Sequence, residues 1–199
     1  DLLGVKFILN KNESLGEKNE PDYLAFPQEE YSLIYQKTPW QIYKNNDALA
    51  RFFLTDSFII EKDKEKIISR LYDYRRDAKT VILEEDLNIP IQKGKGKIKL
   101  IKYSPNKINF YVDTQSNNIL FLSDSFFPGW KAYVDERETK IYRADYAFRA
   151  IFVPSGKHTV MFSYNPKSFY IGTSVTLATI MVIMLYIAIN RMRGKNESK

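Results

Sequence analysis

One stretch of the sequence is dense enough in aromatic and charged side chains to bind a ligand. Residues 124–135 read Asp-Ser-Phe-Phe-Pro-Gly-Trp-Lys-Ala-Tyr-Val-Asp, and the Pro-Gly pair predicts a turn that presents Trp130. Exposed indole and phenol rings stack on sugar rings, while carboxylate and guanidinium groups bind sugar hydroxyls. The candidate glycan-binding residues are Trp130, Tyr133, Asp124, Arg149 and His158. Trp130 could instead be the core tryptophan of a β-sandwich, the interpretation that we favour.

Structural roles are also open to the charged members of this set. Arg149 could form a buried ion pair with Asp124 or Asp145 between strands. His158 lies on the apolar face of an alternating segment, where a buried and hydrogen-bonded histidine is the usual outcome.

A second candidate contact surface consists of alternating lysines. An extended strand would place all of them on one face, where they could meet the phosphates of an anionic polymer or of lipid head groups. These residues are Lys93, Lys95, Lys97 and Lys99. Lysines also protect an edge strand from aggregation, and we favour this structural role.

The composition excludes several chemistries. The 199 residues include no cysteine and one histidine, so that no disulfide, thiolate nucleophile, cysteine-based zinc site or multi-histidine metal centre can form. We therefore predict neither a metal nor a cofactor. The high aromatic content, 15%, favours β-structure.

One segment departs sharply from the mean hydropathy of −0.37. Residues 168–190 contain no charged side chain, and their apolar centre, 171–189, has 19 residues, which matches the roughly 20 helical residues that cross a bilayer. We predict a transmembrane helix over 168–190, with the lipid bilayer as a partner.

The tail after this segment predicts an orientation. Residues 191–199 carry four positive charges and one negative charge, which the positive-inside rule places in the cytoplasm. Residues 1–167 would then be extracytoplasmic, on the cell membrane. Because half of the net charge of +6 lies in this tail, we predict no nucleic-acid partner.

The pattern of the remaining residues predicts a mainly β fold with some α (α+β). Residues 1–92 combine short strands with a helix over 63–76, capped by Asp63, and are expected to form a small α+β unit. Residues 93–167 contain seven short apolar runs with turn signals between them, which predicts a β-sandwich-like domain. The predicted strands there are 97–103, 107–113, 118–123, 131–134, 139–143, 148–153 and 157–164.

The order of motifs over residues 122–172 resembles the C-terminal region of the bacterial YfhO-type membrane proteins. It runs from Leu-Ser-Asp-Ser-Phe-Phe-Pro-Gly-Trp-Lys-Ala-Tyr-Val-Asp, through Tyr-Arg-Ala-Asp-Tyr-Ala-Phe-Arg-Ala-Ile-Phe-Val-Pro-Ser-Gly, to Tyr-Asn-Pro-Lys-Ser-Phe-Tyr. The chain departs from the family pattern at Glu136, where glycine is frequent, at Asp145, where asparagine is frequent, and at Ala50, where proline is frequent.

The resemblance implies a function. Family members are polytopic proteins that resemble the GT-C class of lipid-linked-sugar glycosyltransferases, and they are implicated in glycosylating cell-envelope polymers such as lipoteichoic acid. We accordingly expect this chain to be the end of a longer protein. Its expected partners are the remaining membrane helices of that parent, a polyprenyl-phosphate sugar and an envelope polymer.

No catalytic residue is assigned to this chain, because GT-C enzymes carry their catalytic acid on an early loop between membrane helices. Two alternatives remain. The chain could be a non-catalytic, membrane-anchored module that binds glycan or protein. It could also be a self-contained hydrolase, which would need two carboxylates at a set separation.

Overall fold

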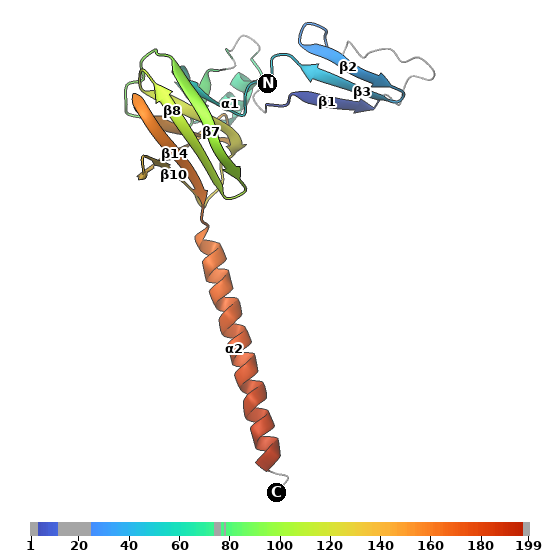
Figure 1. Ribbon diagram of the computed structural model, residues 1–199, viewed down its shortest axis with the longest axis vertical. Coiled ribbons are helices and arrows are strands. Elements are labelled where there is room, and N and C mark those ends of the chain that lie inside the picture. Colours follow the sequence, from blue (N-terminus) through green and yellow to red (C-terminus); the bar gives the residue numbers. More distant parts are fainter. Residues whose placement is uncertain (1–3, 12–24, 74–76, 78, 197–199) are drawn as a thin grey trace.

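The computed structural model describes residues 4–11, 25–73, 77 and 79–196 (Figure 1). Within these residues the chain forms three β-sheets and two helices, α1 and α2. The prediction of a β-rich α+β fold with one C-terminal apolar helix is therefore confirmed.

Two sheets make up the head of the molecule. The five-stranded sheet has the order β11-β10-β14-β8-β7 and is antiparallel throughout. Its strands are β7 (Gly96–Ser104), β8 (Lys107–Thr114), β10 (Trp130–Val134), β11 (Arg137–Thr139) and β14 (Gly156–Tyr164). The six-stranded sheet has the order β4-β9-β13-β12-β6-β5. Its strands are β4 (Phe52–Thr55), β5 (Phe58–Ile60), β6 (Val81–Leu83), β9 (Asn118–Ser125), β12 (Ile141–Ala144) and β13 (Phe148–Val153).

The main core lies between these two sheets. Phe110 and Phe162 of the five-stranded sheet pack in one buried cluster with Leu120, Leu122 and Ile151 of the six-stranded sheet. A second cluster, which includes Phe53 and Phe121, covers the other face of the six-stranded sheet. Burial on both faces explains why residues 118–122 are continuously buried and do not alternate.

A hydrogen-bonded sheet crosses the predicted division at residue 92. Strand β4 pairs with β9, and β6 pairs with β12, so that residues 52–83 contribute strands to the same sheet as residues 118–153. Asp145 stabilises the contact between β6 and the end of β12, because its buried carboxylate accepts a hydrogen bond from the Ile82 backbone N–H at 2.8 Å.

Helix α1 (Lys64–Leu71) begins where the sequence predicts. The side chain of Asp63 accepts hydrogen bonds from the backbone N–H groups of Glu65 and Lys66, which confirms it as the N-cap. The helix ends at Leu71, earlier than predicted, and its C-cap is Tyr72. Residues 74–76 of the predicted helix lie outside the described residues.

A small antiparallel sheet of β1 (Phe7–Lys11), β3 (Trp40–Asn45) and β2 (Tyr31–Lys37) extends from one side of the head (Figure 1). One face is buried: Tyr43 is fully buried, and its ring stacks on Phe26 with centroids 4.4 Å apart. The side chains of the other face are mostly exposed.

Helix α2 (Lys167–Asn196) leaves the head as a separate rod (Figure 1). Its segment Lys167–Ile189 is long and apolar enough to cross a membrane, and none of its most apolar part is buried in the protein. Three threonine hydroxyls in this segment donate to the carbonyl four residues earlier, at 2.9 Å in each case. Their polar groups are thus satisfied within the helix, as an apolar solvent requires.

Candidate functional site

A buried carboxylate with two arginine partners organises the candidate site. Asp124 lies near the end of β9 and is 8% exposed. Its Oδ1 accepts from Arg51 Nε at 2.7 Å and lies 2.6 Å from Arg51 Nη2. Its Oδ2 accepts from Arg149 Nη2 at 2.9 Å. The three groups together carry one net positive charge.

The guanidinium of Arg149 is held between aromatic rings. Its Cζ lies 4.0 Å from the centroid of Trp130 and 5.5 Å from that of Phe162. Arg149 is only 2% exposed, and its Nε and Nη1 have no hydrogen-bond partner among the described residues. Burial lowers the pKa of the Arg149 guanidinium, and the Asp124 carboxylate opposes that effect. Arg149 therefore depends on Asp124 for its charge compensation.

An open pocket of about 380 Å³ adjoins this cluster. Two of its aromatic side chains face solvent, since Phe127 is 59% and Tyr103 46% exposed. The Arg51 guanidinium stacks on Tyr103 at 4.8 Å. The lining residues are Arg51, Tyr103, Ser123, Asp124, Ser125, Phe127, Trp130, Arg149 and Tyr164. Exposed rings beside guanidinium and hydroxyl groups are the features that bind a saccharide.

The pocket lies at the base of the head, next to the start of α2. Trp130 pairs with Tyr164 across β10 and β14, and the Asn165 backbone N–H donates to the Gly129 carbonyl at 2.8 Å. Gly129 has φ +104°, and a Cβ there would lie 3.0 Å from the side chains of Tyr164 and Pro166. The positive φ and the lack of space for a Cβ both require glycine at this turn. The turn can therefore pack closely on Tyr164 and Pro166, just before α2.

The structure brings together three of the five predicted glycan-binding residues: Asp124, Trp130 and Arg149. Trp130 combines both predicted roles, because it is half-buried against the main core and also lines the pocket. Tyr133 lies elsewhere, because it alternates with the fully buried Ala132 and so points away from the core. His158 lies toward the opposite end of β14 from Tyr164.

Sequence reasoning missed six pocket residues, namely Arg51, Tyr103, Ser123, Ser125, Phe127 and Tyr164. Phe127 belongs to the dense aromatic stretch and could have been found there. Arg51 precedes β4, which pairs with β9 across a separation of about seventy residues, and no local pattern reports that pairing.

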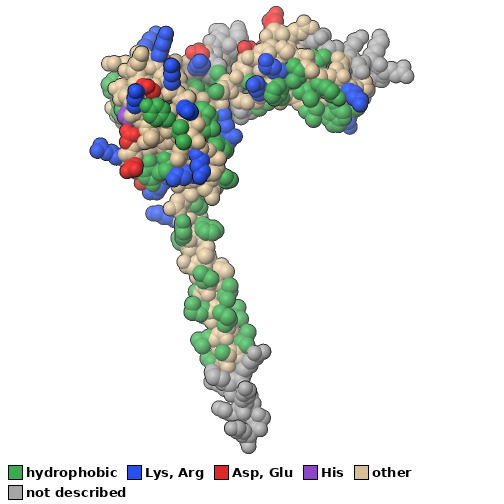
Figure 2. Space-filling view, viewed as in Figure 1, with side chains coloured by type: hydrophobic (Ala, Val, Ile, Leu, Met, Phe, Trp, Pro, Cys, Tyr) green, Lys and Arg blue, Asp and Glu red, His purple; other side chains and the backbone are tan. Residues whose placement is uncertain are grey.

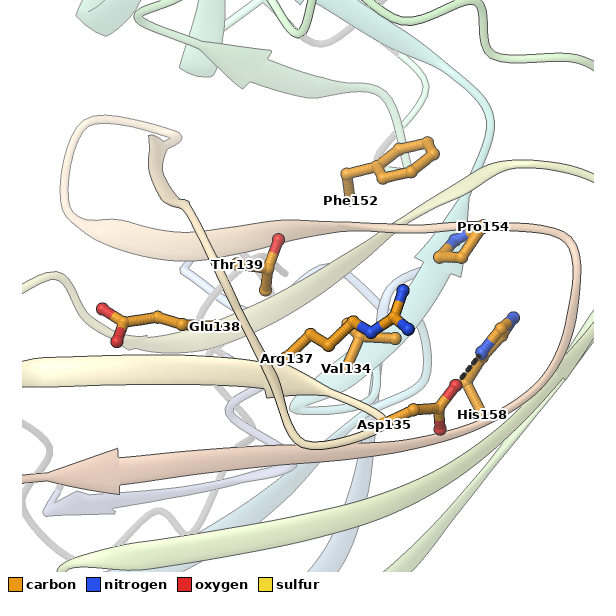
Figure 3. A pocket seen from close by; sticks show the side chains of 8 residues that line it. All are labelled: Val134, Asp135, Arg137, Glu138, Thr139, Phe152, Pro154 and His158. Atoms are coloured by element: carbon orange, nitrogen blue, oxygen red, sulfur yellow. Dashed lines mark hydrogen bonds and ion pairs between the residues drawn. The ribbon is translucent and has the colours of Figure 1, made fainter.

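His158 and Asp135 form a different group of side chains (Figure 3). His158 lies near the start of β14, whereas the end of that strand leads to α2. His158 Nδ1 lies 2.6 Å from Asp135 Oδ2, and the Thr159 backbone N–H donates to Asp135 Oδ1 at 2.8 Å. The hydrogen bond with His158, then that from Thr159, lowers the pKa of the Asp135 carboxyl. Asp135 and Glu136 have φ +47° and +67°, so these contacts hold a turn in the left-handed region. The adjoining pocket measures about 530 Å³.

Asp135→Asn is expected to lower the melting temperature at neutral pH and to weaken its acid dependence. Because the folded-state pKa of Asp135 is lowered, its stabilisation is complete above its ordinary pKa of 3.8 and disappears as pH falls through the folded value. Thermal melts between pH 7 and pH 2 test this. Glu136→Gln removes the same charge from the same turn and should leave the acid dependence intact. An unchanged profile in the Asp135 variant would refute this role.

The four candidate lysines are all exposed, and they lie at an edge of the five-stranded sheet. Lys97 and Lys99 belong to edge strand β7, opposite Asp113 and Tyr111 of β8, whereas Lys93 and Lys95 precede the strand. This placement agrees with lysines that protect an edge. Their contact with an anionic polymer stays a prediction.

The β-rich head and the exposed apolar helix together define a membrane protein with a large domain outside the bilayer. Residues 84–176 match the family described as "Bacterial membrane protein YfhO". The protein "Uncharacterized protein YfhO" of Bacillus subtilis (strain 168) is 23% identical over 100 residues. That match covers 50% of this chain but 12% of the relative. These residues are thus similar to the YfhO-type bacterial membrane proteins, and the similarity agrees with the resemblance that the sequence predicts. No solved structure matches.

Proposed function

We propose that this chain is the extracytoplasmic C-terminal domain and last membrane helix of a polytopic, glycosyltransferase-like membrane protein. Its parent would transfer a sugar from a polyprenyl-phosphate donor to a cell-envelope polymer. The chain itself would hold the saccharide part of a substrate at the outer surface of the membrane. Its pocket beside α2 would be the contact site.

The position of the pocket is the observation that carries this proposal. A polyprenyl-linked sugar has its chain in the bilayer and its saccharide at the interface. The pocket that contains Phe127 and Trp130 adjoins Tyr164, three residues before α2 begins. A head anchored by α2 would therefore present these rings where such a saccharide lies.

The proposed orientation follows from charge. The basic tail after the apolar segment supports a cytoplasmic location for residues 191–199, and hence a head outside, by the positive-inside rule. Sugar transfer from a lipid-linked donor to an envelope polymer requires this arrangement, because the polymer is outside the cytoplasmic membrane.

The chemistry of the pocket supports binding and not bond cleavage. Among the described residues that line it, Asp124 is the only acid, and two guanidinium groups engage its oxygens. Glycoside hydrolysis generally needs a pair of carboxylic groups flanking the bond. We therefore place the catalytic step in the rest of the parent protein. A membrane-anchored module that only binds glycan is the alternative that this observation also supports.

Phe127→Ala is expected to weaken glycan binding about tenfold without unfolding the head. Phe127 is 59% exposed, so its ring contributes little to the core, while loss of a stacking ring removes about 1.5 kcal/mol. Lipoteichoic acid would be titrated against the whole chain in lipid nanodiscs, with Trp130 fluorescence followed in a Trp40→Phe background.

Tyr72→Ala is the matched control, because Tyr72 is 85% exposed and does not line the pocket. It should leave affinity unchanged. Equal affinities for the Phe127 variant and the parent chain would contradict the proposed site. If neither chain binds lipoteichoic acid, this polymer is not the ligand of the pocket.

A further inference from the structure

The small sheet has one exposed face of unusual composition. Register pairs Leu9 with Ile42, and Tyr35 with the same Ile42, while Trp40 pairs with both Lys11 and Lys37. Since paired residues share a face, the apolar and basic side chains occupy one side of the sheet. Four large apolar members are well exposed: Phe7 by 54%, Leu9 by 62%, Tyr35 by 47% and Trp40 by 42%.

The small sheet does not expose these residues because it lacks a packed face, since the residues of its opposite face are buried. Tyr43 is fully buried, Gln41 is 2% exposed, and Asn45 is 6% exposed. The sheet thus already has a core on one side. An exposed patch of large apolar residues on the other side marks a contact surface.

The charges of this face have a single sign. Strands β1, β2 and β3 contain three charged residues, Lys11, Lys37 and Lys44, and no acid. Lys11 and Lys37 each pair with Trp40, and Lys44 pairs with Phe7, so all three lysines share the face of the apolar residues. The Lys11 ammonium lies 5.8 Å from the centroid of the Trp40 ring.

We propose that this face of the small sheet docks on the anionic surface of the bilayer that α2 enters. Tryptophan and tyrosine favour the interface, leucine and phenylalanine enter the acyl boundary, and lysines attract anionic head groups. A protein partner would satisfy the apolar residues, but the charged side chains of the three described strands are all positive, which is complementary to an anionic membrane.

The arrangement of the molecule agrees with this occupant. In Figure 2 hydrophobic side chains gather along the lower margin of the small sheet, with lysines at the edges of the patch, on the side toward which α2 extends. Figure 1 shows the small sheet at the end of the head away from α2, so the head must tilt for this face to reach the bilayer. The tether through α2 raises the effective concentration of the face at the membrane, which favours even a weak contact. The inference does not depend on glycan binding by the pocket.

The fluorescence of Trp40 tests the proposal. The chain has two tryptophans, so Trp130→Phe leaves Trp40 as the sole reporter. The whole chain would be reconstituted in vesicles of equal parts phosphatidylglycerol and phosphatidylcholine, with brominated acyl chains as quenchers. We expect quenching and a blue shift of Trp40 emission, both weaker in vesicles of phosphatidylcholine alone and at high salt.

Replacing Lys11, Lys37 and Lys44 by glutamine should weaken docking on the order of 100-fold, as follows from about 1 kcal/mol per basic residue at an anionic surface. The matched control replaces three exposed lysines at the start of α1, namely Lys62, Lys64 and Lys66, and should retain the quenching. Trp40 emission that bromine leaves unquenched would overturn the proposal. So would shielding of Trp40 from aqueous iodide that rises with protein density and ignores lipid charge, because this would indicate a second copy as the occupant.

Discussion

Replacing Asp124 by alanine is expected to lower the free energy of unfolding by about 3–5 kcal/mol. The variant would leave Arg149, which is 2% exposed, without the carboxylate that compensates its charge. Guanidinium does not lose its proton at ordinary pH, so the buried charge cannot be relieved by titration. Urea unfolding of the whole chain in detergent micelles, followed by the fluorescence of Trp130, measures the effect.

A paired substitution separates this cause from simple loss of packing. Asp124→Leu combined with Arg149→Met removes both charges, and it should restore most of the stability lost in either single variant. Arg51→Gln is the control, because Arg51 is 56% exposed and its ion pair should contribute less than about 1 kcal/mol. Single and double variants of equal stability would show that Asp124 does not compensate Arg149.

Trp130→Ala is expected to lower the free energy of unfolding by about 3 kcal/mol, near the lower end of the range for buried tryptophan. The indole is half-buried against the core between the sheets, its ring lies 5.3 Å from Tyr164, and Arg149 stacks on it at 4.0 Å. Its removal creates a cavity and uncovers a buried cation. The same urea experiment, read by far-ultraviolet circular dichroism, measures the loss.

Trp130→Phe retains an aromatic face for Arg149 and should recover more than half of this stability. A Trp130→Ala chain that unfolds like the parent chain would contradict the packing role. In that case the indole would act as an exposed platform for a ligand. Because Trp130 both packs and lines the pocket, Phe127→Ala is the cleaner variant for binding.

Strands with strong local patterns could be predicted from the sequence with nearly correct limits. Alternation places Ile108, Phe110 and Val112 on one face of β8, and all three are buried in the core between the sheets. Strands β5 and β11 escaped detection, because three residues are too few to display a period. The sheet that joins β4 to β9 was also hidden, because pairing between distant segments leaves no local signature.

The candidate site was predictable to the same extent. Asp124 and Trp130 lie within one short stretch whose composition indicates a binding surface, and the structure places both in one pocket. Tyr133 belongs to the same stretch and His158 to a separate predicted strand, and alternation and strand direction carry both away from the pocket. Arg51 joins the site only through the pairing of β4 with β9.

The central claim is that the pocket beside α2 supports sugar transfer to an envelope polymer. The most direct measurement is the sugar content of lipoteichoic acid from cells in which the full-length parent carries Phe127→Ala. The Tyr72→Ala parent, made to the same membrane level, serves as the control. We expect a marked loss of sugar in the Phe127 strain and normal sugar in the control. Normal sugar in both strains, with the parent required for its addition, would contradict it.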